Sequence, residues 1–397
     1  MGWLLKDRPE KTCEKGHTVP RREPMNPMNR PTLLSRRKVL GGAVAGLCAV
    51  TGKTAQAHQD LTAESGRLIV AGVADSQCGR WADILVPALA EALHVPPFTV
   101  TTTTGWDGVT GANLFDIQQE QAIPPAGLIV PGRAVLAAMC GDSRVHYDYQ
   151  RWVPTFLSHQ PMVAVGRASL HRSLSSIIKG QPLRVAVSTY AGAELPTLLA
   201  LDLLALRPLP VPGFGTPSAA IDALRAGTVE VIQLPFDGEY AGLMASLQED
   251  GFEPLFANAL PKDVFQHRGL PPDFTAIYTQ ERKRAPSSLE YDVWSATTAA
   301  CAMKAGVMLP ILSSPSQVAL WRHACQTVAS QQDLRSHARD ENEVMVTGNA
   351  CAAAYTLMMP DVSVLMALRR WLSLNIPKWR DTLARRSGPP APQQNPN

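Results

Sequence analysis

Short apolar runs alternate with longer helical patterns along most of this chain, and this alternation is the strongest constraint on its fold. A run of about four to eight apolar residues bounded by loop residues is typical of a buried strand. Such strands are expected at 67–71, 98–103, 127–130, 183–187 and 229–233. Helices are expected at 82–93, 195–206 and 219–226. The alternation predicts an α/β fold of mostly parallel sheets flanked by helices, with loops at the strand ends that form a cleft for a small ligand.

The segment 35–57 is basic at its start, apolar in its middle and small and polar at its end. Its apolar middle would be about 18 Å long as a helix, whereas a membrane span needs roughly 20 residues. Ala55 and Ala57 occupy the positions that a signal peptidase reads, so the segment is predicted to be a cleaved export signal. Arg36 and Arg37 stand side by side before the apolar middle and resemble a twin-arginine signal, which exports folded proteins.

The ordinary basic start of a general export signal remains the alternative to the twin-arginine interpretation. In either case residues 1–57 form an N-terminal extension with the cleaved signal, and the mature chain begins near His58. Export by either route predicts a periplasmic protein. Residues 388–397, which are rich in proline and glutamine, are expected to form a disordered tail.

Composition narrows the classes of function that remain. The net charge of +3 includes the basic signal, so the mature chain is close to neutral and no basic patch favours nucleic acid. The nine histidines are scattered, and no metal, haem, dinucleotide or hydrolase motif occurs, so we expect neither a cofactor nor an enzyme. One or two disulfides and free buried thiols both remain open for the cysteines that follow the signal, which are Cys78, Cys140, Cys301, Cys325 and Cys351.

Several segments occur in the order and spacing of one protein family. The glycine loop "TTGWDGVTGAN" follows the second expected strand, and "YDYQRWVPTFLSHQPMVAVGRASL" has the form of a first crossing between two lobes. "VPGFGTPSAAIDALRAGTVEVI" combines a glycine loop, a helix and a strand. "PPDFTAIYTQ" and "LEYDVWSATTAA" have the form of a second crossing, and "RRWLSLNIPKWR" that of a last helix. From about Arg67 to Arg380 the chain resembles the substrate-binding receptors of tripartite tricarboxylate transporters, the Bug-type periplasmic proteins.

This resemblance implies a Venus-flytrap fold of two α/β lobes that hold a small carboxylate and deliver it to integral membrane transporter subunits. It implies a discontinuous first lobe, residues 58–163 plus 291–387, and a second lobe, residues 164–290. A monomer without a nucleic-acid partner is expected. An orphan receptor that hands its ligand to a signalling partner remains an alternative, and an exported enzyme is a more remote one.

The same resemblance indicates which loops bind the ligand. Glycine turns and helix starts offer backbone N–H groups to a carboxylate, and an arginine near a strand end can pair with it through two hydrogen bonds. For Ser188, which follows a buried strand, a plain helix cap remains the alternative role. The predicted ligand-binding residues are Ser76, Gln77, Gly79, Gly105, Trp106, Asp107, Gly108, Arg133, Ser188, Thr189, Tyr190, Gly215 and Thr216.

The first of these loops departs from the family pattern. Where the family has a loop rich in Pro and Gly with an acidic end, this chain has Asp75-Ser-Gln-Cys-Gly79. The side chains of Ser76 and Gln77 would then replace lost backbone contacts, and Trp106 would add a flat apolar wall. We therefore expect a ligand with one carboxylate and an apolar or aromatic body. Packing of Trp106 against its own lobe is the alternative.

Overall fold

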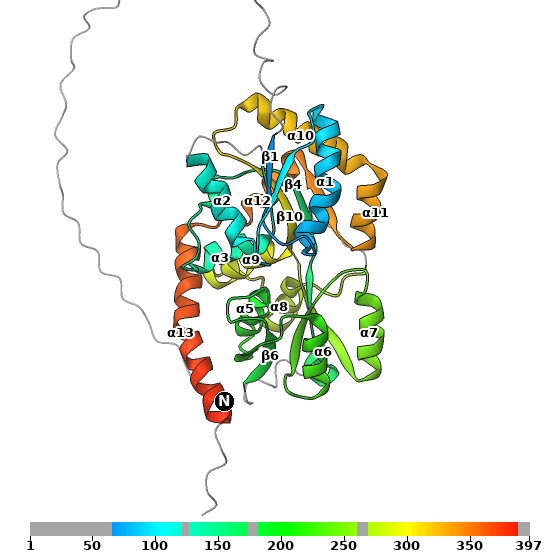
Figure 1. The fold of residues 1–397 in the computed structure, drawn as a ribbon. Helices are drawn as coiled ribbons and strands as arrows, with labels where there is room; N and C mark the ends of the chain where they lie inside the picture. The colour runs from blue at the N-terminus through cyan, green and yellow to red at the C-terminus, as the bar shows by residue number, and fades with distance from the viewer. Residues whose placement is uncertain (1–65, 121–126, 173–181, 260–268, 388–397) are drawn as a thin grey trace, which may run out of the picture. The chain divides into compact units, whose positions relative to one another are not determined.

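The computed structural model describes residues 66–120, 127–172, 182–259 and 269–387 (Figure 1). The export signal, with Arg36, Arg37, Ala55 and Ala57, and the tail 388–397 lie outside the described residues. Within the described ranges, no helix combines the length and the apolar character that a membrane crossing requires. All five cysteines in those ranges are free thiols.

The first sheet has six strands in the order β11-β4-β10-β3-β1-β2. The bounds of these strands are β1 Arg67–Val70, β2 Thr99–Thr102, β3 Gly127–Val130, β4 Val153–His159, β10 Met303–Leu309 and β11 Val344–Thr347. β1 pairs in parallel with β2 and β3, whereas β10 runs antiparallel to β3 and β4, and β11 runs antiparallel to β4. The sheet therefore joins strands from two distant parts of the chain.

The second sheet has five strands in the order β7-β6-β8-β5-β9. The bounds are β5 Met162–Arg167, β6 Leu183–Val187, β7 Pro208–Pro212, β8 Val231–Pro235 and β9 Phe252–Asn258. β6 pairs in parallel with β7 and β8, while β5 runs antiparallel to β8 and β9. The predicted α/β fold with two helix-flanked sheets is confirmed. The sheets are mixed and not mostly parallel as expected, because the strands at the crossings run against their neighbours.

The two crossings between the sheets lie side by side. The short 3₁₀ helix η1 (Tyr149–Arg151) precedes β4, which ends at His159, and β5 begins after only Gln160 and Pro161. The chain returns through α8 (Phe274–Arg282) and α9 (Leu289–Ala302), which leads directly into β10. The backbone N–H of Gln160 donates to the carbonyl of Ala302 at 2.8 Å, so one hydrogen bond ties the outgoing crossing to the returning one.

Helices cover both faces of the first sheet (Figure 1). On one face lie α1 (Gln77–Leu93), α10 (Pro315–Ser330) and α11 (Gln332–Asp340); on the other lie α2 (Val109–Glu120), α3 (Gly132–Cys140), α9 and α12 (Gly348–Thr356). Successive side chains of a strand point to opposite faces. Leu68 and Val70 therefore pack under α1 and α10, while Ile69 packs in the core beneath α2 and α3.

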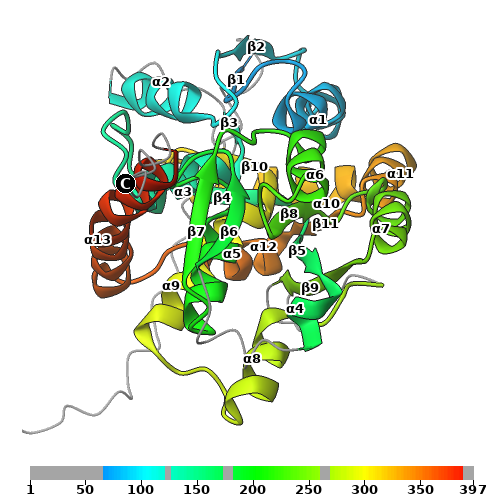
Figure 2. The ribbon, with the colours of Figure 1, turned by 90° about the horizontal axis from the view of Figure 1, so that it is seen from below.

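The second sheet is covered in the same way (Figure 2). Val163 and Val165 of β5 pack under α6 (Pro217–Arg225) and α7 (Tyr240–Glu249). Ala164 points to the opposite face, toward the core that contains residues of α5 (Leu195–Leu203), α8 and α9. The short helix α4 (Ala168–Arg172) follows β5. The long helix α13 (Val362–Ser387) contacts α3, α9 and β7, and so it packs against elements of both sheets.

Candidate functional site

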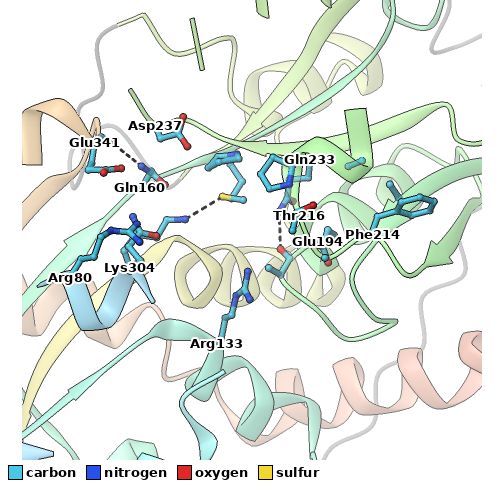
Figure 3. A pocket seen from close by; sticks show the side chains of 18 residues that line it. Arg80, Arg133, Gln160, Glu194, Phe214, Thr216, Gln233, Asp237, Lys304 and Glu341 are labelled. Carbon is cyan, nitrogen blue, oxygen red and sulfur yellow. Dashed lines mark hydrogen bonds between the residues drawn. The ribbon is translucent and has the colours of Figure 1, made fainter. Parts of the chain in front are cut away.

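Two adjoining cavities occupy the cleft between the two sheets, with volumes of about 200 Å³ and 580 Å³. The walls on one side come from α1, α3 and β10 of the first sheet. The walls on the other side come from the loops that follow β6, β7 and β8 of the second sheet. The two cavities share Gln77, Arg80, Arg133, Met162, Ala193, Gly215, Thr216 and Lys304. They are therefore described together as the cleft, and Figure 3 shows the side chains that line the smaller cavity.

Lys304 places an ammonium group inside the cleft, on strand β10. It lines both cavities, and its Nζ atom lies 3.7 Å from the Sδ atom of Met162, a weak acceptor. Burial lowers the pKa of Lys304 to about 8, while the charge of the nearby Glu343 opposes that shift and the guanidinium of Arg133 adds to it. A buried cation without a close carboxylate is costly, so this ammonium group is poised to gain from an anionic partner.

Two arginines add to the positive charge on the first-sheet side of the cleft. Arg133 lies in the first turn of α3, lines both cavities, and forms no hydrogen bond or ion pair with any residue that the structure describes. Figure 3 shows its side chain pointing from α3 toward the open centre of the cavity. Arg80 of α1 donates to the carbonyl of Asp75 at 3.0 Å. We call Arg80, Arg133 and Lys304 the cation cluster.

Three carboxylates line the smaller cavity. Glu194 precedes α5, Asp237 follows β8, and Glu341 follows α11. Asp237 Oδ1 accepts a hydrogen bond from the backbone N–H of Glu239 at 3.1 Å, and partial burial is the main cause that raises the Asp237 pKa. We call Glu194, Asp237 and Glu341 the acidic group. The cleft thus presents both signs of charge.

A buried carboxylate behind the cleft holds the side chain of Gln77. Glu343 accepts hydrogen bonds from Gln77 Nε2, from Ser158 Oγ and, at 2.8 Å, from Trp81 Nε1. Burial raises the pKa of Glu343 to about 7, although the charge of Lys304 and the hydrogen bonds from Trp81 and Gln77 oppose the shift. Because α1, β4 and the loop before β11 meet at this one group, Glu343 fixes the wall on which Gln77 lies.

A second polar network supports Gln233 and Ala193, which form the floor of the smaller cavity on the second-sheet side. Gln233 of β8 donates to the carbonyl of Ala193 at 2.9 Å and accepts from Thr197 Oγ1 at 2.7 Å. Asn258 donates to Thr197 Oγ1 at 2.7 Å and accepts from Trp294 Nε1 at 3.1 Å. A network whose members satisfy one another holds its side chains in one arrangement, so this floor is rigid.

The larger cavity is more apolar than the smaller one. Trp106, Pro131, Met162 and Met303 line it together with the cation cluster. The Trp106 side chain is exposed, at 62% of its possible surface, so it does not pack into its own core. The larger cavity can therefore accept an apolar body attached to a group held by the cations.

Most of the residues predicted from the sequence lie at the cleft. Those that line it are Ser76, Gln77, Trp106, Arg133, Ser188, Gly215 and Thr216. Asp107 and Thr189 line a neighbouring cavity of about 610 Å³ that shares Arg133 and Ser188 with the cleft. These residues come from loops far apart in the sequence, and the fold brings them together.

Several of these side chains already have partners in the protein. Ser76 caps α1, since its Oγ donates to the carbonyl of Val73 at 2.6 Å and accepts from Gly79 N at 3.0 Å. Thr216 caps α6 by accepting from Ala219 N at 3.3 Å. The Ser188 hydroxyl donates to Glu194 Oε2 at 2.8 Å. Asp107 pairs with Arg144 at 2.8 Å.

Four predicted residues do not line these three cavities. A Cβ atom on Gly79 would lie 2.1 Å from the carbonyl oxygen of Ala74, so this glycine permits close packing at the start of α1. Gly105 and Gly108 have φ values of +100° and +79°, and a Cβ on Gly108 would lie 2.7 Å from the ring of Pro131. Tyr190 stacks on Trp379 of α13, with ring centroids 6.2 Å apart. In the structure, close packing accounts for Gly79 and Gly108, the positive φ accounts for Gly105, and the contact with α13 accounts for Tyr190.

The sequence prediction missed Lys304, Glu194, Gln160, Gln233, Asp237 and Glu341, all of which line the smaller cavity. One signal was available, because Lys304 is the only charged residue between 293 and 321. A single cation inside such an apolar stretch points to a buried functional charge. The acids and amides carry no comparable signal, since each lies within or next to an ordinary strand or helix.

Comparisons with known proteins agree with this architecture. No protein-family model and no curated protein matches the chain. A TctC solute-binding protein from Polaromonas, solved without ligand, is 14% identical over 76% of this chain and 97% of its own, with a TM-score of 0.55. MatC from Rhodopseudomonas palustris with bound malate is 17% identical over 80% of this chain and 98% of its own, with a TM-score of 0.45. A protein from R. palustris with adipate is 16% identical over 77% and 97%, with a TM-score of 0.48.

The likeness to the TctC protein shows the fold. The chain has the two-sheet α/β fold of a periplasmic solute-binding protein of that type, at low sequence identity. The fold that the sequence resemblance implied is therefore confirmed.

Proposed function

We propose that this protein is a divergent periplasmic receptor of the tripartite tricarboxylate transporter type. It captures a small carboxylate in the cleft and delivers it to integral membrane transporter subunits, without catalysing a reaction. The observation that carries the proposal is the cation cluster. Arg80, Arg133 and Lys304 face the cleft, and none of them takes part in an ion pair within the ranges that the structure describes.

The carboxylate binds at Arg133 and Lys304. Arg133 offers a planar fork of donors, and Lys304 offers a point charge that water solvates poorly at this depth. The α3 N-terminus, where Arg133 lies, adds the positive end of the helix dipole. Both residues line both cavities. A ligand whose carboxylate lies between them can therefore place its apolar part in the larger cavity.

The body of the ligand lies against Trp106, Pro131 and Met303, which line the larger cavity. Gly215 and Thr216 close the opposite side from the loop before α6. This arrangement supports a ligand with an apolar or aromatic body, because such a body gains by leaving water while the charged end stays paired.

The crossings at Gln160–Pro161 and at α9 support a division into two lobes close to the predicted one, residues 58–163 plus 291–387 and residues 164–290. Strand β5 of the second sheet begins at Met162, two residues before the predicted boundary. Receptors of this kind close over the ligand by hinge motion about a few residues at the ends of secondary-structure elements. The side-by-side crossings, tied by the bond from Gln160 N to Ala302 O, suit that role.

A thermal-shift screen of mono-, di- and tricarboxylates, aromatic acids included, tests the proposed function. A ligand at a hundredfold excess over its Kd stabilises the folded state by about 2.7 kcal/mol. Arg133→Gln and Lys304→Met should each reduce the shift given by the best ligand, while Lys378→Met on the exposed part of α13 should leave it unchanged. Turnover of a ligand, or a shift that survives both cleft substitutions, would overturn the proposal.

A further inference from the structure

The smaller cavity of the cleft is lined by as many acids as cations. The cation cluster comes from α1, α3 and β10 on the first-sheet side. Glu194 and Asp237 come from the second-sheet side, and Glu341 lies where α11 ends. A cavity of about 200 Å³ is therefore lined by three positive and three negative side chains.

These opposite charges do not neutralise one another by contact. The ion pairs among the described residues involve Arg144, Arg184 and Arg225, all of them outside the cation cluster. The cavity keeps the acids and the cations more than the 4 Å of an ion pair apart. Charges that are partly desolvated and held apart in this way are complementary to a ligand that bridges them.

Part of the acidic group is free to accept further hydrogen bonds. Asp237 Oδ1 is used by the backbone N–H of Glu239, whereas no residue in the described ranges donates to Oδ2. No described residue donates to the carboxylate of Glu341 either. Besides partial burial, the charge of Glu341 raises the pKa of Asp237, whereas the charge of Lys304 lowers it. Glu194 differs, because its Oε2 already accepts from Ser188 N and Ser188 Oγ.

We propose that the ligand is a zwitterion, an amino acid with an apolar side chain. This inference rests on the proposed function, since it places the carboxylate at Arg133 and Lys304. The ammonium group of the ligand lies at Asp237 and Glu341. The side chain of the ligand extends into the larger cavity against Trp106 and Met303. A plain dicarboxylate fits less well, because its second anionic group would face the acidic group.

Matched pairs of compounds test this inference by calorimetric titration of the purified protein. L-Phenylalanine is compared with 3-phenylpropanoate, and L-leucine with 4-methylpentanoate, so that the members of a pair differ only in the amino group. We expect each amino acid to bind at least tenfold more tightly than its partner. If the deaminated acids bind as tightly or more tightly, the zwitterion is wrong and the proposed function stands. If no member of either pair binds, the zwitterion is overturned, and the thermal-shift screen of carboxylates decides the proposed function separately.

A substitution in the acidic group makes the test specific. In Asp237→Asn the affinity of the amino acid, divided by that of its deaminated partner, should shrink at least fivefold. The amino acid loses an ionic partner, and the deaminated acid loses a repulsion. Asp222→Asn removes the same charge from the exposed outer side of α6 and should leave the ratio as it is. An unchanged ratio in Asp237→Asn would overturn the assignment of the ammonium group to this carboxylate.

Discussion

The Nζ atom of Lys304 on β10 lies 3.7 Å from the Sδ atom of Met162 on β5, so the first sheet and the second sheet meet at an ammonium–thioether contact. A thioether is a poor substitute for the water that the ammonium group has lost. Because this contact lies in the cleft, a bound carboxylate should strongly favour the protonated form of Lys304.

Ligand affinity should depend on the charge of Lys304. Its pKa lies at about 8 in the empty cleft, and a bound carboxylate would raise it. Affinity for a carboxylate should therefore be constant below about pH 7 and fall as the pH rises above about 8, by up to tenfold per unit. Titrations from pH 6 to 10 measure this, and Lys304→Met should abolish the fall. If affinity still falls above about pH 8 in Lys304→Met, a titrating group other than Lys304 causes the pH dependence.

Glu343 should make stability depend on pH in the opposite sense from a salt-bridged acid. Its pKa is raised from 4.5 to about 7, so between these values the folded state binds more protons than the unfolded state. The free energy of unfolding should therefore decrease as the pH rises from 5 to 7, by on the order of 1 to 3 kcal/mol. In Glu343→Gln this slope should vanish. Chemical denaturation at several pH values measures it, and an unchanged slope would contradict the assignment.

Trp106→Ala should weaken a ligand with a ring by roughly 1 to 3 kcal/mol, the cost of losing a large apolar contact. The protein itself should keep its melting temperature, since the Trp106 side chain is 62% exposed. Leu312→Ala removes an apolar side chain that is 89% exposed and distant from the cleft lining, and serves as the control. Equal affinity of Trp106→Ala and the parent would place the ring of the ligand elsewhere.

Two glycines should respond in opposite ways to alanine. A Cβ on Gly132 would lie 1.8 Å from the carbonyl oxygen of Ala300, so Gly132→Ala should separate α3 from α9 and lower the free energy of unfolding by about 1 to 3 kcal/mol. Gly242 in α7 has open space at its Cβ position, and Gly242→Ala should stabilise the helix by about 0.5 to 1 kcal/mol. Urea denaturation measures the free energy of unfolding of both variants, which should fall below that of the parent in Gly132→Ala and rise above it in Gly242→Ala.

Export should require both Arg36 and Arg37 if the signal is of the twin-arginine type. Replacing both with lysine keeps the positive charge and should abolish the appearance of the protein in the periplasm. Mass spectrometry of the exported parent should find an N-terminus at His58. Normal export of the double variant would leave the general signal as the remaining interpretation.

Apolar patterning predicted the strands well where loops isolate them. The expected strands at 127–130 and 183–187 coincide with β3 and β6, because each is a buried run bounded by breaks in the pattern. The helix expected at 82–93 begins earlier, at Gln77, since Ser76 caps it. Patterning could not separate α9 from β10, which follow each other inside one apolar stretch.

The candidate site was harder to predict because it depends on contacts between distant segments. Trp106 and Thr216 could be placed at the cleft from the family resemblance, and Arg133 from its position near an expected strand end. The partner of Gln77 could not, since Glu343 lies 266 residues away in the sequence. The glycines were assigned to the ligand, although close backbone approach is what Gly79 and Gly108 provide in the structure.

The order of the strands in the chain has a consequence for synthesis. The second sheet uses residues 162–258 without interruption, whereas the first sheet needs β10 and β11, which end at Thr347. A chain emerging from the ribosome can complete the second sheet while β3 and β4 still lack the strand that joins them. Nascent chains that stop before Met303 therefore leave one edge of β3 and both edges of β4 unpaired, and unpaired strand edges are sites of aggregation that a chaperone would shield.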